Sequence, residues 1–418
     1  MDGRGIRTPR LASWVYSGNS YRTFPLLVVA PCAYIIALAL PSLSYDIPLL
    51  AFGFLAMLVS LGILTGSHFH RVPLLVPSLA FLGATALSIV FSADVGRSLR
   101  LSVHYLPATL LLLLISQFRI CRQTRVLFWC LSLFSLSLSS ALLLAALAGG
   151  GTDPKQWLSY LKIPIFVVVN DIAFLSVLIP FSVSLLLLRP HSFIKRVPLS
   201  LSILLTICLA CSYQSRTPIL IAFISLVTAV SFHRRRLFYI YAFSALLLVL
   251  IVDGLLGFPF TRKFALGFNG RIPLWMTAFS MFVDAPILGH GPHTFGLFYL
   301  DYLHRLEIPT WLSVDPRPLS WAHNVYMQVL AEQGIIGALA LVILIICAVR
   351  LAWRTHRHSE GDIRILNSGA FSALIALCIA GMFDASLMRE WFVTTLFVIL
   401  GIVSHLSTLA TLERRKVE

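Results

Sequence analysis

The sequence predicts an all-α membrane protein, a polytopic bundle of about 12 transmembrane helices with one large helical loop on the outer side. Apolar residues make up 58% of the 418 residues, and the mean hydropathy is +0.88. Charged residues account for only 12%, about half the usual share in soluble domains. The apolar residues also form long continuous runs, and about 20 such residues in a helix cross the hydrocarbon core of a bilayer. These three observations exclude a soluble globular protein.

Twelve apolar runs have the length, or nearly the length, of a membrane span. The fourth and eighth are short, which indicates tilted or broken helices. Each run is continuous rather than alternating, so helices and not barrel strands are predicted. The predicted spans are residues 24–43, 47–65, 72–93, 104–118, 126–148, 164–188, 197–213, 217–232, 237–256, 323–349, 365–384 and 391–410.

Charged residues sort to the two sides of this predicted bundle. With a cytoplasmic N-terminus, one side carries 21 of the 32 basic residues and 5 of the 17 acidic ones, whereas the other side is nearly balanced. This bias follows the positive-inside rule and places both termini in the cytoplasm. The net charge of +15 is therefore a topology signal that meets anionic lipid headgroups. Membrane lipids are predicted partners, and nucleic acid is not.

The connections between predicted spans are short, except for the outer segment 257–322. It divides the chain into helices 1–9 over residues 1–256, the loop itself, and helices 10–12 with a cytoplasmic tail over residues 323–418. The loop is rich in aromatic residues, and long loops in compact proteins are usually functional. Helices are predicted at 272–283 and 294–306, separated by proline-containing turns. We expect this loop to cap the outer membrane surface.

Arg216 lies in the outer turn between the seventh and eighth spans, within Gln214-Ser215-Arg216-Thr217-Pro218. An interfacial arginine can simply anchor a helix by reaching the lipid headgroups. A planar guanidinium also holds two phosphate oxygens at once, which a lysine ammonium does not. The turn alone leaves both roles open.

Arg271 opens the first predicted loop helix, and Trp275 follows one turn later on the same face. The indole could pack on the guanidinium or on a sugar ring. Gly289 and Gly291 come next, and glycine lets a backbone turn tightly and approach a ligand. A structural arginine on an amphipathic loop helix is the alternative.

His323 and Asn324 open the tenth predicted span. A histidine at the outer end of a span can act as a neutral base, and a purely structural histidine is an equal alternative. Glu332 is predicted to point away from His323 on the helix, so we expect it to be a structural group, either paired or neutral. Gly334 and Gly337 are predicted to permit close helix packing.

Three further polar residues lie near the same side. Asn170 and Asp171 begin the sixth span, either as a helix cap or as sugar ligands. Arg389 lies in the turn between the last two spans, beside Asp384 and Glu390, with which a local ion pair is possible. The sequence contains neither a D-x-D nor an H-E-x-x-H motif. A transferase with these residues would neutralise a pyrophosphate leaving group with arginines, so neither a metal nor a cofactor is predicted.

Three motifs occur in order along the chain. They are Ser215-Arg216, then Arg271-x-x-x-Trp275 with Pro286-x-x-Gly289-x-Gly291, then His323-Asn324 with Glu332-x-Gly334-x-x-Gly337. Together with the topology, they resemble the O-antigen ligase and O-antigen polymerase superfamily of bacterial polytopic glycosyltransferases. The resemblance covers roughly residues 165–400, and the first five spans match only as hydrophobic helices.

The resemblance implies a metal-independent, inverting transferase of the GT-C type in the bacterial inner membrane, with its active site on the periplasmic side. Its donor would be a glycan on undecaprenyl diphosphate, and a ligase would transfer that glycan to the lipid A–core of lipopolysaccharide. By the same match, Arg216 and Arg271 would hold the diphosphate, and His323 would take the proton of the attacking hydroxyl. The further candidates for substrate contacts are Asn324, Trp275, Asn170, Asp171, Arg389, Arg305 and Arg317.

Other functions fit parts of this pattern. A polymerase of the same superfamily would use a growing glycan as acceptor, but two sizeable arginine-rich outer loops are typical of polymerases, and only 257–322 qualifies here. A ligase that glycosylates proteins would share the fold. A lipid-linked glycan transporter would also have twelve spans. Repeated halves, which are typical of transporters, are not recognisable in the sequence, and of the ionisable groups expected near mid-bilayer it shows only one, Glu332. The sequence therefore favours a ligase.

Overall fold

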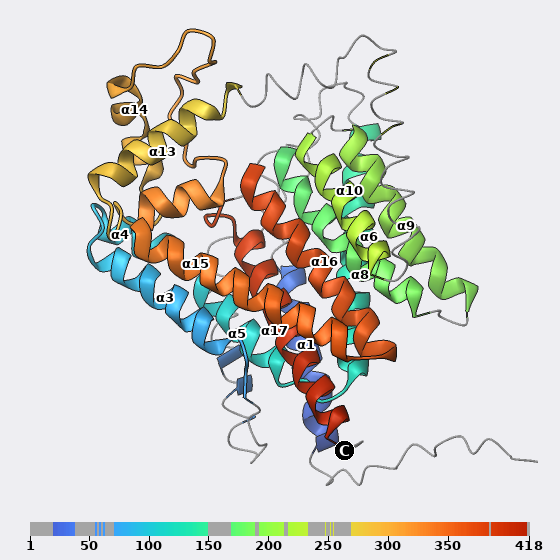
Figure 1. The fold of residues 1–418 in the computed structure, drawn as a ribbon. Helices are drawn as coiled ribbons and strands as arrows, with labels where there is room; N and C mark the ends of the chain where they lie inside the picture. Colours follow the sequence, from blue (N-terminus) through green and yellow to red (C-terminus); the bar gives the residue numbers. More distant parts are fainter. Residues whose placement is uncertain are drawn as a thin grey trace, which may run out of the picture.

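The computed structural model describes residues 20–37, 71–148, 169–188, 192–212, 216–232, 269–383 and 386–415, with isolated positions within 55–62 and 247–254. All the secondary structure in these residues is helical, which confirms the predicted class (Figure 1). The predicted spans 47–65 and 237–256 lie almost entirely outside the described residues. The number of twelve spans therefore stays a prediction.

The helices alternate with short connections along most of the described chain. Six helical segments within the described residues are long and apolar enough to cross a membrane: Val95–Ser116, Cys121–Ala145, Phe193–Ser212, Val325–His358, Gly361–Phe383 and Glu390–Arg414. Several shorter helices are also apolar, as expected for the eighth span. The elements are α1 (Ser20–Ala37), α3 (Leu75–Val90), α4 (Val95–Ser102), α5 (Tyr105–Ser116), α6 (Cys121–Ala148), the 3-10 helix η2 (Val169–Ile172), α8 (Ala173–Leu187), α9 (Phe193–Ser212), α10 (Arg216–Ser231), α13 (Ile272–Asp284), α14 (Phe295–Arg305), α15 (Val325–His358), α16 (Gly361–Phe383) and α17 (Glu390–Arg414).

Two helices, α8 and α17, form the centre of the bundle. α17 packs against α5 and α16, and α8 packs against α9, α10 and α16. Both helices are buried over most of their length, from Ala173 to Leu185 in α8 and from Trp391 to Leu406 in α17. A helix that is apolar on every side is stable only where other helices surround it, and this accounts for their central position.

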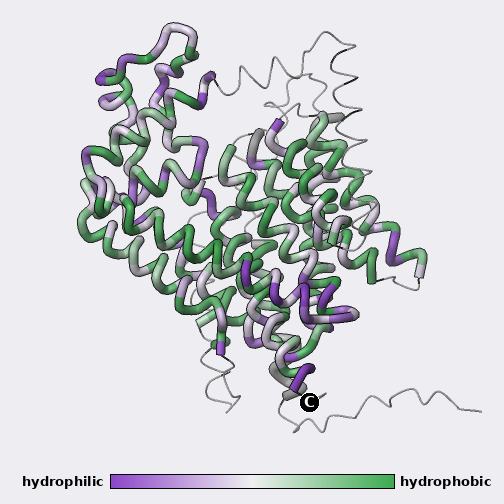
Figure 2. The backbone as a smooth tube through the Cα atoms, in the orientation of Figure 1, coloured by the Kyte–Doolittle hydropathy of each residue, from purple (hydrophilic) through white to green (hydrophobic). Residues whose placement is uncertain are grey.

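Hydrophilic residues gather towards the two ends of the helices, as the hydropathy colouring in Figure 2 shows. At one end, Arg125 forms an ion pair with Asp362, and Arg414 donates a hydrogen bond to the carbonyl oxygen of His358 at 2.8 Å. The opposite end holds the start of α15 together with α13 and α14. The basic connections and the predicted outer loop therefore lie at opposite ends of the bundle.

The outer loop contains the two helices that the sequence predicts. α13 spans Ile272–Asp284 and α14 spans Phe295–Arg305, against predicted ranges of 272–283 and 294–306. The two helices share a small hydrophobic core, which includes Met281, Phe295 and Tyr299. They pack on the first part of α15 (Figure 1), so the loop is fixed to the bundle by apolar burial.

α15 is broken at Gly334, where φ is 60° and ψ is −162°. Residues 286–291 lie against the break and replace the lost helical hydrogen bonds: Gly291 N donates to Glu332 O at 2.8 Å, and Ile335 N donates to Pro286 O at 2.9 Å. We call this the loop–kink contact (residues 286–291 against 331–336). A break in a membrane helix is tolerated where the backbone groups find such partners.

The loop–kink contact corrects two predictions about glycines. A Cβ on Gly334 would lie 2.4 Å from the carbonyl group of Ile287. The missing side chain therefore leaves room for the backbone of the outer loop and not for a neighbouring helix. A Cβ on Gly289, where φ is 68°, would lie 2.3 Å from the carbonyl carbon of Glu332. Gly289 therefore approaches the backbone of α15 and not a ligand.

Replacing Gly334 with alanine should destabilise the protein by roughly 3 kcal/mol or more, because the backbone conformation is one that only glycine adopts readily and the new methyl group would overlap Ile287. Thermal unfolding of the purified protein in detergent measures this effect. Gly83→Ala is the matched control, since Gly83 lies within α3 and a methyl group there would meet nothing within 4 Å, so alanine favours the helix. Equal unfolding temperatures for the two variants would contradict the prediction.

Candidate functional site

An open cleft of about 410 Å³ lies at the outer end of the bundle, which is within the usual size of ligand pockets. It lies between the start of α13 and the segment that leads into α15. The lining residues are Gly270, Arg271, Leu274, Ser313, Val314, Asp315, Pro316, Arg317, Leu319 and His323. The cleft therefore brings together three of the residues that the sequence selects: Arg271, Arg317 and His323.

Arg216 is the first residue of α10 and precedes the apolar part of that helix. Burial, and then the positive charge of Arg271, lower the pKa of Arg216. The two guanidinium groups are therefore close enough to repel each other, although they come from separate segments of the sequence. An anion with more than one negative charge would relieve this repulsion, and a diphosphate is such an anion.

His323 lies just before α15 rather than within it, because the helix begins at Val325 with Asn324 as its N-cap. Its φ angle is 52°, a left-handed conformation that is costly for a residue other than glycine. Trp321 Nε1 donates a hydrogen bond to His323 Nδ1 at 3.2 Å. The ring of His323 thus has a defined orientation at the edge of the cleft.

A buried ion pair joins the turn before α17 to η2, just before α8. Arg389 Nη2 donates to Asp171 Oδ2, and the two side chains are only 14% and 4% exposed. Trp391 Nε1 donates to the other carboxylate oxygen of Asp171 at 3.0 Å. Arg389 also lies over the ring of Trp321, 5.0 Å from its centroid. Asp171 and Arg389, which are predicted as substrate contacts, thus bind each other. Arg389 also packs on Trp321, which in turn donates a hydrogen bond to His323.

Replacing Asp171 with asparagine should destabilise the protein by about 3 kcal/mol, because it leaves the buried Arg389 without its countercharge. Thermal unfolding in detergent measures the change, and Asp171→Asn combined with Arg389→Gln should recover part of it. Asp94→Asn is the control, because Asp94 is an exposed N-cap of α4 and asparagine caps a helix equally well. A loss no larger than that of the control would refute a stabilising role for this pair.

The remaining candidates have local partners. Arg317 forms an ion pair with Asp315 at 2.5 Å, and this hydrogen bond lowers the pKa of Asp315 to about 2. Arg305 lies 3.8 Å from Asp284 and over the ring of Tyr302, and it does not line the cleft.

Three more candidates belong to helix starts or to the loop core. Asn324 Oδ1 accepts hydrogen bonds from the backbone N–H groups of Tyr326 and Met327, so its oxygen caps α15. Trp275 packs against the small core of the outer loop. Asn170 lies in η2, and its side chain is outside the described structure.

Glu332 has the structural role that the sequence predicts. It is 4% exposed, and its Oε1 accepts hydrogen bonds from Phe295 N at 3.0 Å and Gln328 Nε2 at 3.2 Å. Through Phe295, its carboxyl group connects α15 to the first residue of α14. It therefore supports the loop–kink contact and is not a partner of His323.

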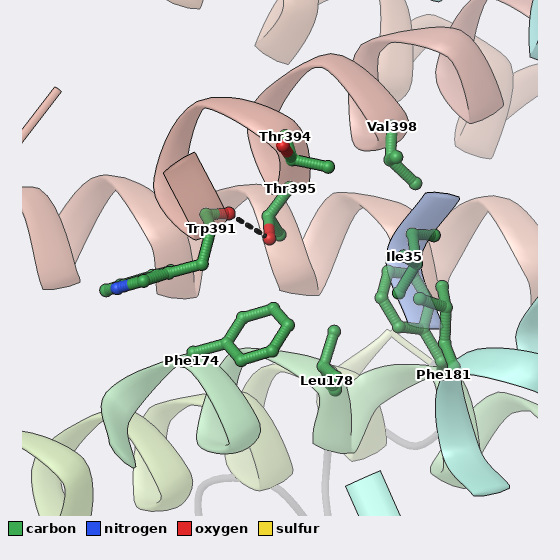
Figure 3. Close-up of a pocket in the computed structure, with 9 residues that line it drawn as sticks. Ile35, Phe174, Leu178, Phe181, Trp391, Thr394, Thr395 and Val398 are labelled. Atoms are coloured by element: carbon green, nitrogen blue, oxygen red, sulfur yellow. Dashed lines mark hydrogen bonds between the residues drawn. The ribbon is translucent and has the colours of Figure 1, made fainter. Parts of the chain in front are cut away.

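A second pocket, shown in Figure 3, lies between α1, α6, α8 and α17. Its free volume of about 10 Å³ holds about one water molecule. Apolar side chains line it together with Thr394 and Thr395, and the Thr395 hydroxyl donates to the carbonyl oxygen of Trp391. The pocket offers no charged group among its described lining residues, so the chemistry is expected in the outer cleft.

Residues 201–342 match the family model described as O-antigen ligase. This segment of the chain is thus similar to the O-antigen ligase and polymerase superfamily, as the motifs predict. The matched segment is narrower than the range expected from the motifs, but it includes Arg216, Arg271 and His323 and runs from α9 through the break in α15. No curated protein matches the chain.

Members of this superfamily are membrane enzymes of the glycosyltransferase or ligase type, and the apolar helices of this chain together with the family match indicate a multi-pass membrane protein. Lipid-linked glycan and lipid A–core are the general partners of such ligases.

Two residues at the site escape prediction from sequence, namely Trp321 and Asp315. Trp321 is two residues before His323 in the sequence, and Asp315 is two residues before Arg317, so their spacing to a candidate is the signal that could have found them.

Proposed function

We propose that this protein is an O-antigen ligase, which transfers a glycan from undecaprenyl diphosphate to the lipid A–core of lipopolysaccharide. One observation carries the proposal. Arg216 and Arg271, from separate segments of the chain, lie within electrostatic reach of each other, and Arg271 shares an open cleft with His323. Two neighbouring fixed cations, one of which shares the cleft with a polarisable imidazole, form an arrangement suited to the displacement of a diphosphate.

In the proposed reaction, a hydroxyl oxygen of the acceptor sugar attacks the anomeric carbon of the donor. The hydroxyl O–H bond breaks and its proton passes to His323. The new C–O bond forms as the bond from the anomeric carbon to the phosphate oxygen breaks, with inversion at that carbon. The electron pair leaves with undecaprenyl diphosphate, and Arg216 and Arg271 stabilise its negative charge. Arginine supplies this charge without a metal ion.

The charge distribution supports a periplasmic site in the inner membrane. The basic connections lie at the end of the bundle opposite to the cleft, and basic connections remain on the cytoplasmic side of a membrane. The outer cleft then faces the periplasm, where the lipid-linked donor and the lipid A–core acceptor would meet.

Transfer by the purified full-length protein in detergent tests this function. The substrates are a glycan on undecaprenyl diphosphate and lipid A–core, and the expected product is lipid A–core with the glycan attached. A detergent solution has no second compartment, so transport alone cannot form this product. Absence of transfer from an intact donor would refute the ligase function.

The lipids of cells that lack this protein separate a ligase from a polymerase. Loss of a ligase should leave long glycan chains on the carrier lipid, whereas loss of a polymerase should leave single repeat units. Accumulation of single units would replace the proposed function with polymerisation.

A further inference from the structure

We propose that Trp321 is a positioning residue that determines specificity: it keeps the proton-accepting nitrogen of His323 from water until an acceptor hydroxyl displaces the indole. The inference rests on the proposed glycan transfer, and it assigns a role to a residue outside the three catalytic candidates.

The hydrogen bond from Trp321 determines which nitrogen of His323 can accept a proton. The indole N–H is only a donor, so at 3.2 Å it requires a lone pair on His323 Nδ1. A neutral imidazole then carries its own proton on Nε2. The nitrogen that can act as a base is therefore the one that the indole occupies.

A second contact, over the face of the ring, holds the indole in this position. Arg389 lies 5.0 Å from the centroid of the Trp321 ring, and Arg389 is in turn paired with the buried Asp171. The rings of Trp321 and His323 have their centroids 5.3 Å apart. This series of contacts runs from the centre of the bundle to the edge of the cleft, and it holds the indole N–H at Nδ1.

The other charged groups at the cleft do not compete for this role. Arg271 and Arg317 are cations and therefore do not act as bases. Arg389 is also a cation, and it packs over the ring of Trp321. The carboxylate of Asp315 lies within electrostatic reach of His323, but its hydrogen bond with Arg317 makes it a weak base, with a pKa of about 2. His323 Nδ1 is thus the base that the described cleft provides.

Control of Nδ1 matters because water can perform the same chemistry as a sugar hydroxyl. If water donates its proton to Nδ1, its oxygen forms the bond to the anomeric carbon, and undecaprenyl diphosphate leaves with the electron pair. The donor is then hydrolysed and the glycan is lost. One hydrogen bond between neutral groups is weak enough for an acceptor hydroxyl to replace it when the rest of the acceptor is bound. A single water molecule has no such additional contacts.

Hydrolysis of the donor without acceptor tests the inference. With the purified full-length protein and a glycan on undecaprenyl diphosphate, Trp321→Phe should release free glycan about tenfold faster than the natural protein, since one hydrogen bond corresponds to roughly that factor. Trp311→Phe is the matched control, because Trp311 belongs to the same loop, is 65% exposed and does not line the cleft. In Trp321→Phe combined with His323→Ala, the extra hydrolysis should disappear.

The outcomes separate this inference from the proposed function. The inference is overturned if the natural protein transfers glycan but Trp321→Phe hydrolyses the donor no faster than Trp311→Phe. Trp321 would then not keep water from His323 Nδ1. If the natural protein transfers no glycan, the proposed function fails and the inference fails with it. Should Trp321→Phe not fold, benzothienylalanine at the same position replaces the indole N–H by sulfur at nearly unchanged shape, and the same tenfold rise is expected.

Discussion

Replacing His323 with alanine should lower the rate of glycan transfer by about two to four orders of magnitude, the usual contribution of a positioned general base. Without the imidazole, the attacking hydroxyl keeps its proton as the new bond forms, and the barrier rises. The arginines at the cleft are unchanged, so binding of the lipid-linked donor should be retained. Initial rates of transfer and equilibrium binding of the donor measure the two quantities separately.

His304→Ala is the control for this variant, because His304 is exposed on α14 of the same loop and does not line the cleft. It should transfer glycan at the natural rate. A His323→Ala enzyme within about threefold of the natural rate would mean that His323 is not the base. Loss of donor binding in that variant would instead assign His323 to the diphosphate.

Replacing Arg271 or Arg216 with lysine should lower glycan transfer on the order of a hundredfold, although the net charge is preserved. A lysine ammonium provides one point of positive charge, whereas a guanidinium donates two parallel hydrogen bonds to phosphate oxygens. These bonds matter most when the diphosphate gains charge as it leaves, so the turnover rate should fall more than donor affinity. Steady-state kinetics with the lipid-linked donor measure both.

The control is Arg100→Lys, since Arg100 is exposed near the end of α4 and outside the cleft. Insertion into the membrane and the unfolding temperature should be the same for all three variants. Full transfer by both Arg216→Lys and Arg271→Lys would count against a diphosphate clamp.

Much of the helical architecture can be predicted from the sequence, because a membrane helix must satisfy its backbone internally and is recognisable as a long apolar run. The same holds for α13 and α14, whose apolar residues and flanking prolines define their ends within one residue. The break at Gly334 could not be predicted, since the apolar pattern continues through it. It depends on backbone partners at residues 286–291, which lie more than 40 positions earlier.

The candidate site can be predicted only in part, for a similar reason. Arg271 and His323 can be selected because they lie on the outer side of the predicted bundle, which most of the basic residues avoid, and because they carry recognisable chemistry. The partner of Arg389 cannot be predicted in this way. The neighbours of Arg389 in the sequence suggest a local ion pair, but its side chain binds Asp171, 218 positions away. The structural role of Glu332 is predictable, because a buried carboxyl group must find donors wherever they lie.

The loop–kink contact also limits how this protein can be recombined with related proteins. Arg271 precedes the segment that fills the break in α15, and His323 precedes the break itself, so one set of backbone hydrogen bonds fixes the spacing of both. A chimaera that exchanges only the outer loop would join a foreign segment to a native break and shift the arginine relative to the histidine. Exchange of acceptor preference between related enzymes should therefore succeed only when residues from about 269 to 337 are grafted as one unit.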